Sequence, residues 1–184
     1  PVSAFNGRED GTWDNGTAAY EKRGIAVDVP EWKIGNCIQC NQCAYVCPHA
    51  VIRPFLATEE EAAASGVEWK QGLGETKEYK FRIQISPMDC TGCSNCVDVC
   101  PAKDKALVMR PLEEQMPQQK NWDYITKNIG YKQVVDKTKS VKNLQFAQPL
   151  LEFSGACAGC GETPYIKAIS QLFGDKMMVA NATG

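Results

Sequence analysis

The chain has 184 residues, of which 43% are hydrophobic and 23% charged, and its formal net charge at pH 7 is −2. This length and composition fit one or two domains with packed cores. The charge balance provides no basic footprint for nucleic acid, no apolar run approaches the roughly 18 residues of a membrane span, and the opening PVSAFNGRED lacks the features of a secretory signal. We therefore expect no nucleic-acid or membrane partner and a cytoplasmic location. The lack of an initial Met and the abrupt ending in ANATG predict an internal piece of a longer polypeptide.

An internal repeat follows an irregular opening. Residues 1–33, rich in Gly, Asp and Asn, are expected to form an extended lead-in. The repeat lies within residues 34–110, where CIQCNQCAYVCP at 37–48 returns as CTGCSNCVDVCP at 90–101. A short β-type run, AVI or ALVM, follows each unit and is closed by Arg-Pro. Because neither unit alone can bury its apolar side, we expect the two to pack as a pseudo-twofold pair.

The insertion between the repeats, residues 55–89, carries local signals of its own. Thr58 and Glu61 have the spacing of a capping box for a short helix, TEEEAAAS, which Gly66 would end. The alternation in YKFRIQI predicts a strand that leads into the second cysteine run. The glutamates between these signals are expected to form a solvated face rather than a binding site.

The character of the chain changes after the second repeat. Residues 111–150 are polar and Lys-rich, and we expect a linker with one helical stretch near 118–128. Beyond it, PLLEF predicts a buried strand end, ETPYIKAISQLFG a helix with Pro164 in its first turn, and KMMVA a short strand. One face of that helix is apolar and consists of Tyr165, Ile169 and Leu172. This order predicts that 151–184 begin an α/β domain that the chain does not complete.

Eight of the ten cysteines form two tight groups with identical spacing. C-x2-C-x2-C-x3-C-P is the run with which bacterial ferredoxins bind [4Fe-4S] clusters, and its fourth cysteine ligates the cluster of the other run. The spacing therefore predicts two clusters with crosswise ligation. The first set is Cys37, Cys40, Cys43 and Cys100, and the second set is Cys90, Cys93, Cys96 and Cys47. The predicted fold class is accordingly α+β, with a ferredoxin-like dicluster domain followed by the beginning of an α/β domain.

A disulfide framework and a zinc site fit the cysteine spacing less well. A secreted disulfide framework would spread the cysteines as loop staples, and a structural zinc site is built from two C-x2-C pairs rather than from a triplet with a distant fourth thiol. Two one-electron centres this close form an electron relay, with no catalytic residue of their own. His49, which follows Cys47 and Pro48, is expected to be either a hydrogen-bonded structural residue or one that tunes a cluster. Arg53 and Arg110, at equivalent repeat positions, suit a structural ion pair or recognition of an acidic electron carrier.

Two further cysteines, Cys157 and Cys160, lie apart from the repeats in SGACAGCGETPYIK. Their C-x2-C spacing is half of a four-thiolate site, and no cysteine follows them in the chain. Cys160 lies just before the expected helix, where the partial positive charge and free amides of a helix N-terminus stabilise a thiolate. Glu162, at the same helix entry, is explicable without any cofactor.

The chain resembles the pyruvate:ferredoxin (or flavodoxin) oxidoreductases, which are thiamine diphosphate enzymes of anaerobic metabolism. The resemblance runs from end to end. It is most specific in GTAAYEKRGIAVDVPEW (16–32) and QPLLEFSGACAGCGETPYIK (148–167), and it continues through LFGD and ANATG. The two ferredoxin runs are shared with many other proteins. The resemblance implies that residues 151–184 open the domain that binds the diphosphate end of thiamine diphosphate.

The resemblance also implies roles for three residues of this segment. Cys157 and Cys160 would supply two of the four ligands of a third, proximal [4Fe-4S] cluster. The next ligand in the family follows directly after an ATG like the one at 182–184. Glu162 would contact thiamine diphosphate.

The resemblance further implies the activity of the parent protein, the oxidative decarboxylation of pyruvate to acetyl-CoA and CO2. Electrons would pass through the [4Fe-4S] clusters to ferredoxin or flavodoxin. Thiamine diphosphate and Mg would be cofactors, coenzyme A the co-substrate, and a homodimer the expected assembly. This chain would be the electron-transfer wire, without catalytic competence of its own. A free-standing dicluster carrier and an oxidoreductase for another 2-oxoacid are the alternatives.

Overall fold

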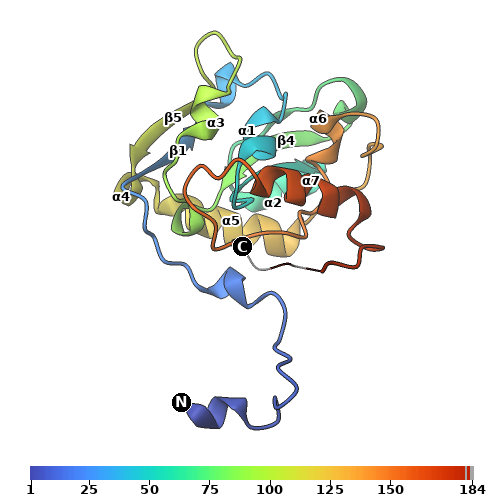
Figure 1. The fold of residues 1–184 in the computed structure, drawn as a ribbon. Coiled ribbons are helices and arrows are strands. Elements are labelled where there is room, and N and C mark those ends of the chain that lie inside the picture. The colour runs from blue at the N-terminus through green and yellow to red at the C-terminus, as the bar shows by residue number, and fades with distance from the viewer. Residues whose placement is uncertain (181, 183–184) are drawn as a thin grey trace.

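The computed structural model describes residues 1–180 and 182, and two small antiparallel sheets form its framework (Figure 1). The strands are β1 (Asp28–Trp32), β2 (Ile52–Ala57), β3 (Lys70–Gln71), β4 (Lys80–Ile85) and β5 (Leu107–Pro111). β1 pairs with β5, and the other sheet has the order β2-β4-β3. Because β1 and β2 flank the first cysteine run and β4 and β5 the second, each repeat pairs its strands with those of the other. This crosswise pairing joins the repeats as the expected pair, and the strands predicted after each run and in YKFRIQI are confirmed.

Most helices are short and lie in the connections between strands. The α-helices are α1 (Gln42–Val46), α2 (Glu59–Ser65), α3 (Asn95–Asp98), α4 (Leu112–Gln115), α5 (Pro117–Asn128), α6 (Val141–Leu144) and α7 (Thr163–Phe173). Single 3-10 turns are η1 (Val2–Phe5), η2 (Thr17–Tyr20), η3 (Ile34–Asn36), η4 (Gly74–Thr76) and η5 (Pro87–Asp89). α2, α5 and α7 confirm the three helices predicted from the sequence, and Pro164 lies in the first turn of α7. None of the described helices combines the length and apolarity that crossing a membrane requires.

The capping box predicted for α2 is present. The backbone N–H of Glu61 donates to the Thr58 hydroxyl at 3.3 Å, and the N–H of Thr58 donates to the Glu61 carboxylate at 2.8 Å. Lys132 donates to the second oxygen of that carboxylate at 2.8 Å. Gly66 ends the helix with a φ of +66°, a left-handed conformation that glycine adopts without strain.

We expect Thr58→Ala to lower the free energy of unfolding by about 1 kcal/mol, because the backbone N–H of Glu61 loses the hydroxyl that accepts its hydrogen bond. Thr58→Ser is the matched control, since it keeps the hydroxyl. Chemical denaturation of the iron-loaded chain, followed by fluorescence, measures the difference. Equal stabilities of the Ala and Ser variants would contradict the role assigned to the cap.

Two groups of buried apolar side chains hold the elements together. The larger group joins residues of both sheets, among them Val29, Ile83 and Leu107, and it includes the side chains of Cys47, Cys90 and Cys96. The smaller group packs Phe55 of β2 against Ile125 of α5. The segment expected to be a linker, 111–150, thus contributes α5 to the packed interior, and the expected lead-in, 1–33, contributes β1 to a sheet.

Two strands predicted near the end of the chain are not formed, so these predictions are wrong. PLLEF, at 149–153, and KMMVA, at 176–180, lie outside any strand. A strand requires a neighbour for its N–H and C=O groups, and neither segment pairs with a sheet edge in the described structure. Met178 is instead fully exposed at 100%, and Val179 at 78%. Of the ATG at 182–184, residues 183 and 184 lie outside the described residues.

Helix α7 turns its polar side toward the rest of the chain. Lys167 and Gln171 are buried, whereas Tyr165 and Ile169 of the predicted apolar face are 62% and 47% exposed. The helical period identified the apolar face correctly. It did not identify the face that packs on the repeats, because polar acceptors for Lys167 lie there.

Candidate metal centre

Two small cavities are each bordered by four cysteine side chains. One is lined by Cys37, Cys40, Cys43 and Cys100, and the other by Cys47, Cys90, Cys93 and Cys96. The structure thus brings together the members of the first set and those of the second set, each with a thiol from the opposite repeat. The contact between α1 and α3 explains this exchange, because each of these helices directs its run's last cysteine toward the other repeat.

The two cysteine loops share an unusual backbone conformation. Gln39 and Gly92, at equivalent positions, have φ values of +60° and +70°, and Asn41 and Ser94 have values of +61° and +65°. Turns of this kind direct successive N–H groups into a concavity that suits a negatively charged group. Gly92 also has little room for a side chain, since a Cβ would lie 3.1 Å from the carbonyl oxygen of Asp28. Gln39 is held in place by side-chain hydrogen bonds to two backbone groups, at 2.8 and 3.0 Å.

Burial raises the pKa of three of these thiols and makes them weaker acids. Desolvation, reinforced by neighbouring cysteines, raises the pKa of Cys43 and of Cys96, and it raises the pKa of Cys90 to about 12. Grouped thiols of this kind become stable thiolates when a metal supplies positive charge. A site for a single metal ion needs three or more His, Cys, Asp or Glu side chains that meet at one point, and the described residues form no such group. The four thiols of each set instead surround a cavity. Four soft thiolates around a cavity are the donor chemistry of an iron–sulfur cluster.

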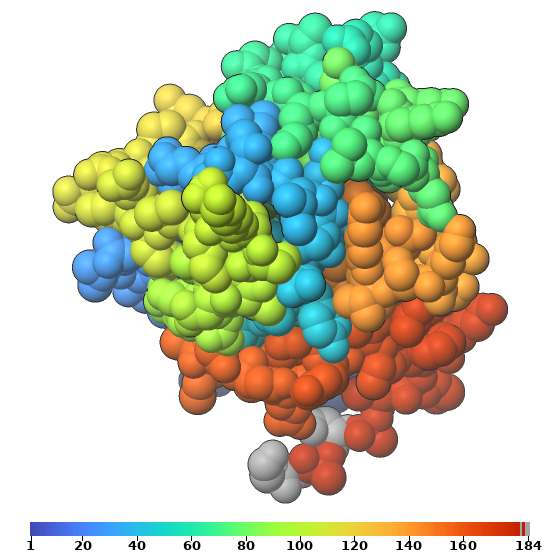
Figure 2. Space-filling model, turned by 90° about the horizontal axis from the view of Figure 1, so that it is seen from above, coloured from blue at the N-terminus to red at the C-terminus, as the bar shows by residue number. Residues whose placement is uncertain are grey.

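The loop with the last two cysteines lies against the second cysteine run. A Cβ on Gly159 would be 3.5 Å from the Cβ of Cys93, and Figure 2 shows the orange and red segment beyond residue 150 beside the yellow-green second repeat. Cys157 is exposed. The amides of Thr163 and Glu162 and the Thr163 hydroxyl lower the pKa of Cys160, as the sequence predicted for a thiol at a helix N-terminus. Glu162 is exposed immediately before α7.

His49 lies between this loop and the second set. Its ring borders the cavity of the second set, and it also borders a larger cavity of about 300 Å³ that Cys157 lines. Nδ1 lies 3.1 Å from the carbonyl oxygen of Ser154, while Nε2 is buried without a hydrogen-bond partner in the described structure. Desolvation lowers the pKa of His49, which favours the neutral ring. The hydrogen-bonded structural role is therefore present.

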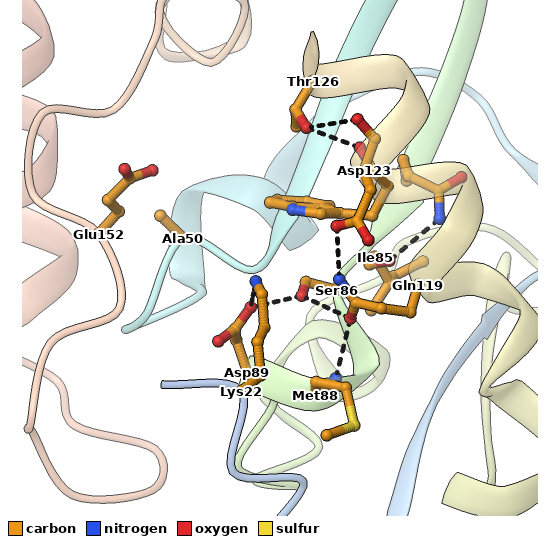
Figure 3. Close-up of polar contacts among 12 residues, drawn as sticks. Lys22, Ala50, Ile85, Ser86, Met88, Asp89, Gln119, Asp123, Thr126 and Glu152 are labelled. Atoms are coloured by element: carbon orange, nitrogen blue, oxygen red, sulfur yellow. Dashed lines mark hydrogen bonds and ion pairs between the residues drawn. The ribbon is translucent and has the colours of Figure 1, made fainter. Parts of the chain in front are cut away.

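The lead-in segment is fastened to the start of the second cysteine run (Figure 3). The ammonium of Lys22 forms an ion pair with Asp89, which also accepts a hydrogen bond from the Ser86 hydroxyl at 2.5 Å. Gln119 of α5 accepts from the same hydroxyl at 3.2 Å and from the N–H of Met88 at 3.4 Å. This network holds the backbone just before Cys90, so the lead-in and α5 both position the second set.

Arg53 has a structural role. Its guanidinium is buried, forms an ion pair with Glu152, and lies 4.8 Å from the centroid of the Trp122 ring and 5.4 Å from that of Phe153. This contact ties the PLLEF segment to α5 and β2. Its repeat equivalent, Arg110, pairs with Glu31 at 3.3 Å at the surface. The ion-pair interpretation of both arginines is therefore confirmed.

Lys167 is a site residue that the sequence did not reveal. Its ammonium lies among backbone carbonyls at the end of α1, between Cys43 and Cys47. Burial lowers the pKa of Lys167 to about 8. Negative charge on Cys47 and Cys43 would oppose that shift, and the positive charge of Arg53 adds to it. The only available signal was a lysine opposite the apolar face of a predicted helix, and such a position ordinarily indicates a solvated face.

Comparison with protein families identifies the class of domain that the chain contains. A family model described as a 4Fe-4S dicluster domain matches residues 36–103, and another, EKR, described as a domain of unknown function, matches residues 1–26. The chain therefore contains an iron–sulfur dicluster domain, a class of domain that carries electrons.

The relatives that match the whole length of the chain are named as oxidoreductases or dehydrogenases of pyruvate. The chain is 57% identical over 186 residues to a pyruvate-flavodoxin oxidoreductase of Klebsiella pneumoniae and 55% identical over 188 residues to a pyruvate:ferredoxin oxidoreductase of Moorella thermoacetica. It is also 49% identical over 187 residues to a mitochondrial pyruvate dehydrogenase [NADP(+)] of Euglena gracilis. Each match covers 100% of this chain but only 16%, 16% and 10% of the relative. The chain thus aligns from end to end with one segment of each of these relatives and spans only a minor part of their length.

Proposed function

We propose that this chain is the electron-transfer segment of an enzyme that decarboxylates pyruvate oxidatively to acetyl-CoA and CO2. The observation that carries the proposal is the end-to-end identity of about half or more with three relatives that are all named for pyruvate. A free-standing dicluster carrier would not account for the matched residues outside the dicluster domain. Another 2-oxoacid as substrate remains the second candidate, because the segment that would bind the substrate lies outside this chain.

The first set and the second set would each hold one [4Fe-4S] cluster, which supplies a one-electron donor and acceptor when bound. The two cavities with four thiols each support this assignment. The chain's own contribution is to keep these groups close together and out of water. Apolar side chains of both sheets pack around the buried thiols, and left-handed loop residues of this kind would direct N–H groups toward the clusters.

Cys157 and Cys160 would be half of a third cluster site on the side of the second set. The packing of Gly159 on Cys93 and the position of His49 between two cavities support this order. Electrons would then reach the second set first, pass to the first set, and leave to an external carrier. The relatives' names include flavodoxin, ferredoxin and NADP(+), so the acceptor would be determined outside this segment.

Residues 151–184 would begin a thiamine diphosphate-binding α/β domain, with Glu162 in contact with the cofactor. The exposed apolar face of α7 supports an unfinished domain, because such faces ordinarily pack on further elements. Thiamine diphosphate and Mg, coenzyme A and a homodimeric assembly would belong to the whole protein, of which this chain is a minor part.

Metal analysis tests the proposal. The anaerobically reconstituted chain is expected to bind about eight iron and eight sulfide as two [4Fe-4S] clusters. Colorimetric iron and sulfide determination, together with the visible absorption spectrum, gives the result. Bound zinc without sulfide, in a colourless protein, would refute it. Full-length protein that is loaded with clusters but oxidises another 2-oxoacid in preference to pyruvate would favour the second candidate.

A further inference from the structure

A buried lysine of α7, Lys167, binds the backbone carbonyls at the end of α1, the short helix that lies between Cys40 and Cys47. The ammonium of Lys167 donates to the carbonyl oxygens of Ala44, Tyr45 and Cys47, at 3.0 Å for Tyr45 and 3.1 Å for Cys47. The residue is only 2% exposed. Within residues 1–180 and 182, no carboxylate forms an ion pair with it. A buried ammonium of this kind requires compensating negative charge nearby.

The second repeat has a matching lysine of its own. Lys105 donates to the carbonyl oxygens of Asp98 and Cys100, at 3.0 and 2.9 Å, at the end of α3. Lys105 lies two residues before β5, and Ala50 lies two residues before β2 in the first repeat. Both residues have a positive φ, +33° for Lys105 and +54° for Ala50. The first repeat therefore lacks the lysine at the equivalent position, and α7 supplies an ammonium from far along the chain.

The location of Lys167 gives its charge a specific electrostatic effect. The last carbonyls of a short helix attract a cation, which accounts for the hydrogen bonds. When clusters are bound, Cys43 and Cys47, which belong to different sets, would be thiolates and would supply the compensating charge. A [4Fe-4S] cluster with four thiolates is negative and gains one more negative charge on reduction, so a fixed nearby cation favours the reduced form.

We propose that Lys167 is a positioning residue that holds the turn from Cys43 to Cys47 and, as a fixed positive charge, raises the reduction potentials of the clusters in both sets. Through this contact, the seating of α7 would be coupled to the electron affinity of the dicluster domain. The inference rests on the ligand assignment proposed above.

The test compares Lys167→Met, Lys167→Gln and Lys167→Arg in the full-length protein by iron analysis and by redox titration monitored with electron paramagnetic resonance. We expect both neutral variants to keep their iron and to lower the equilibrium constant for reduction of both clusters by about tenfold, which is 59 mV for a one-electron couple. Lys167→Arg keeps the charge and should keep potentials close to those of the unaltered protein.

Two further lysines serve as matched controls. Lys137→Met removes the same charge beside α7, where Lys137 donates to the Gln171 carbonyl at 2.7 Å without contacting a cysteine, and it should leave both potentials unchanged. Lys105→Met should lower mainly the potential of the cluster that includes Cys100.

Three outcomes separate the possibilities. Full iron and unchanged potentials in Lys167→Met and Lys167→Gln would overturn the inference. Loss of iron from both neutral variants, with iron retained in Lys167→Arg, would support the positioning part, because only the charged side chains then hold the turn; an unchanged potential in Lys105→Met would then overturn the electrostatic part. If the unaltered protein binds no [4Fe-4S] clusters, the proposed function itself has failed, independently of any variant.

Discussion

Cys47→Ala is expected to remove the cluster bound by the other run, at Cys90, Cys93 and Cys96, and to leave the cluster of its own run in place. The reason is that Cys47 borders the second cavity and not the first. The loss of one ligand from a four-thiolate site leaves an iron without a protein partner. Iron per chain should therefore fall from about eight to about four.

Alkylation of free thiols under anaerobic conditions, mapped by mass spectrometry, identifies which site is lost. In Cys47→Ala the thiols at 90, 93 and 96 should become reactive, while those at 37, 40, 43 and 100 stay protected. Cys100→Ala is the reciprocal control and should expose the thiols at 37, 40 and 43. Reactivity of the run that contains the substituted cysteine, in either variant, would contradict crosswise ligation.

Local signals in the sequence were sufficient for the dicluster domain. Cysteine spacing predicts the two sets because the ferredoxin loop wraps one cluster corner and offers its last thiol to a neighbour. The capping box at Thr58 and Glu61 predicts α2, since its donors and acceptors all lie within four residues. The period of ETPYIKAISQLFG predicts α7 for the same reason. In each case the residues that determine the structure are neighbours in the chain.

The features that the sequence did not predict depend on distant partners. β1 pairs with β5, about 80 positions away, and nothing within DVPEW identifies that partner. Lys167 is buried because carbonyls about 120 positions earlier accept its hydrogen bonds. The predictions of strands in PLLEF and KMMVA were wrong for a related reason. The apolar residues of these segments favour a strand, but in the described structure no strand edge lies beside them to pair with. The composition of a segment predicts its tendency to form a strand, and the fold determines whether a partner strand is present.

These distant contacts lie at several points around the two sets. Lys22 fastens the lead-in to the residues before Cys90, and Lys167 fastens α7 to the turn from Ala44 to Cys47. Arg53 joins the segment after residue 150 to α5 through Glu152 and Trp122. Segments outside the ferredoxin repeats thus bear on the geometry of the cysteines. Such an arrangement suits a segment whose electron transfer depends on the larger protein around it.

The double change Cys157→Ser and Cys160→Ser is expected to leave the iron content of the 184-residue chain almost unchanged. Two thiolates cannot hold a [4Fe-4S] cluster whose other two irons lack protein ligands, and Cys157 is exposed here. A loss of about four iron from the chain would show that these cysteines already bind a cluster, and the half-site interpretation would have to be abandoned.

In the full-length protein the same double change should remove about four iron and abolish electron delivery to the first and second sets, because the half-site would be complete there. Rapid freezing after pyruvate addition, with electron paramagnetic resonance of the reduced clusters, measures this delivery. Thiamine diphosphate should remain bound, since the two cysteines are not its proposed partners. Glu162→Gln is the matched variant of the same helix entry and should have the converse effect, weaker thiamine diphosphate binding with the iron of all three clusters retained. Retained iron and normal cluster reduction in the double variant would exclude Cys157 and Cys160 from the electron path, whatever the first and second sets bind.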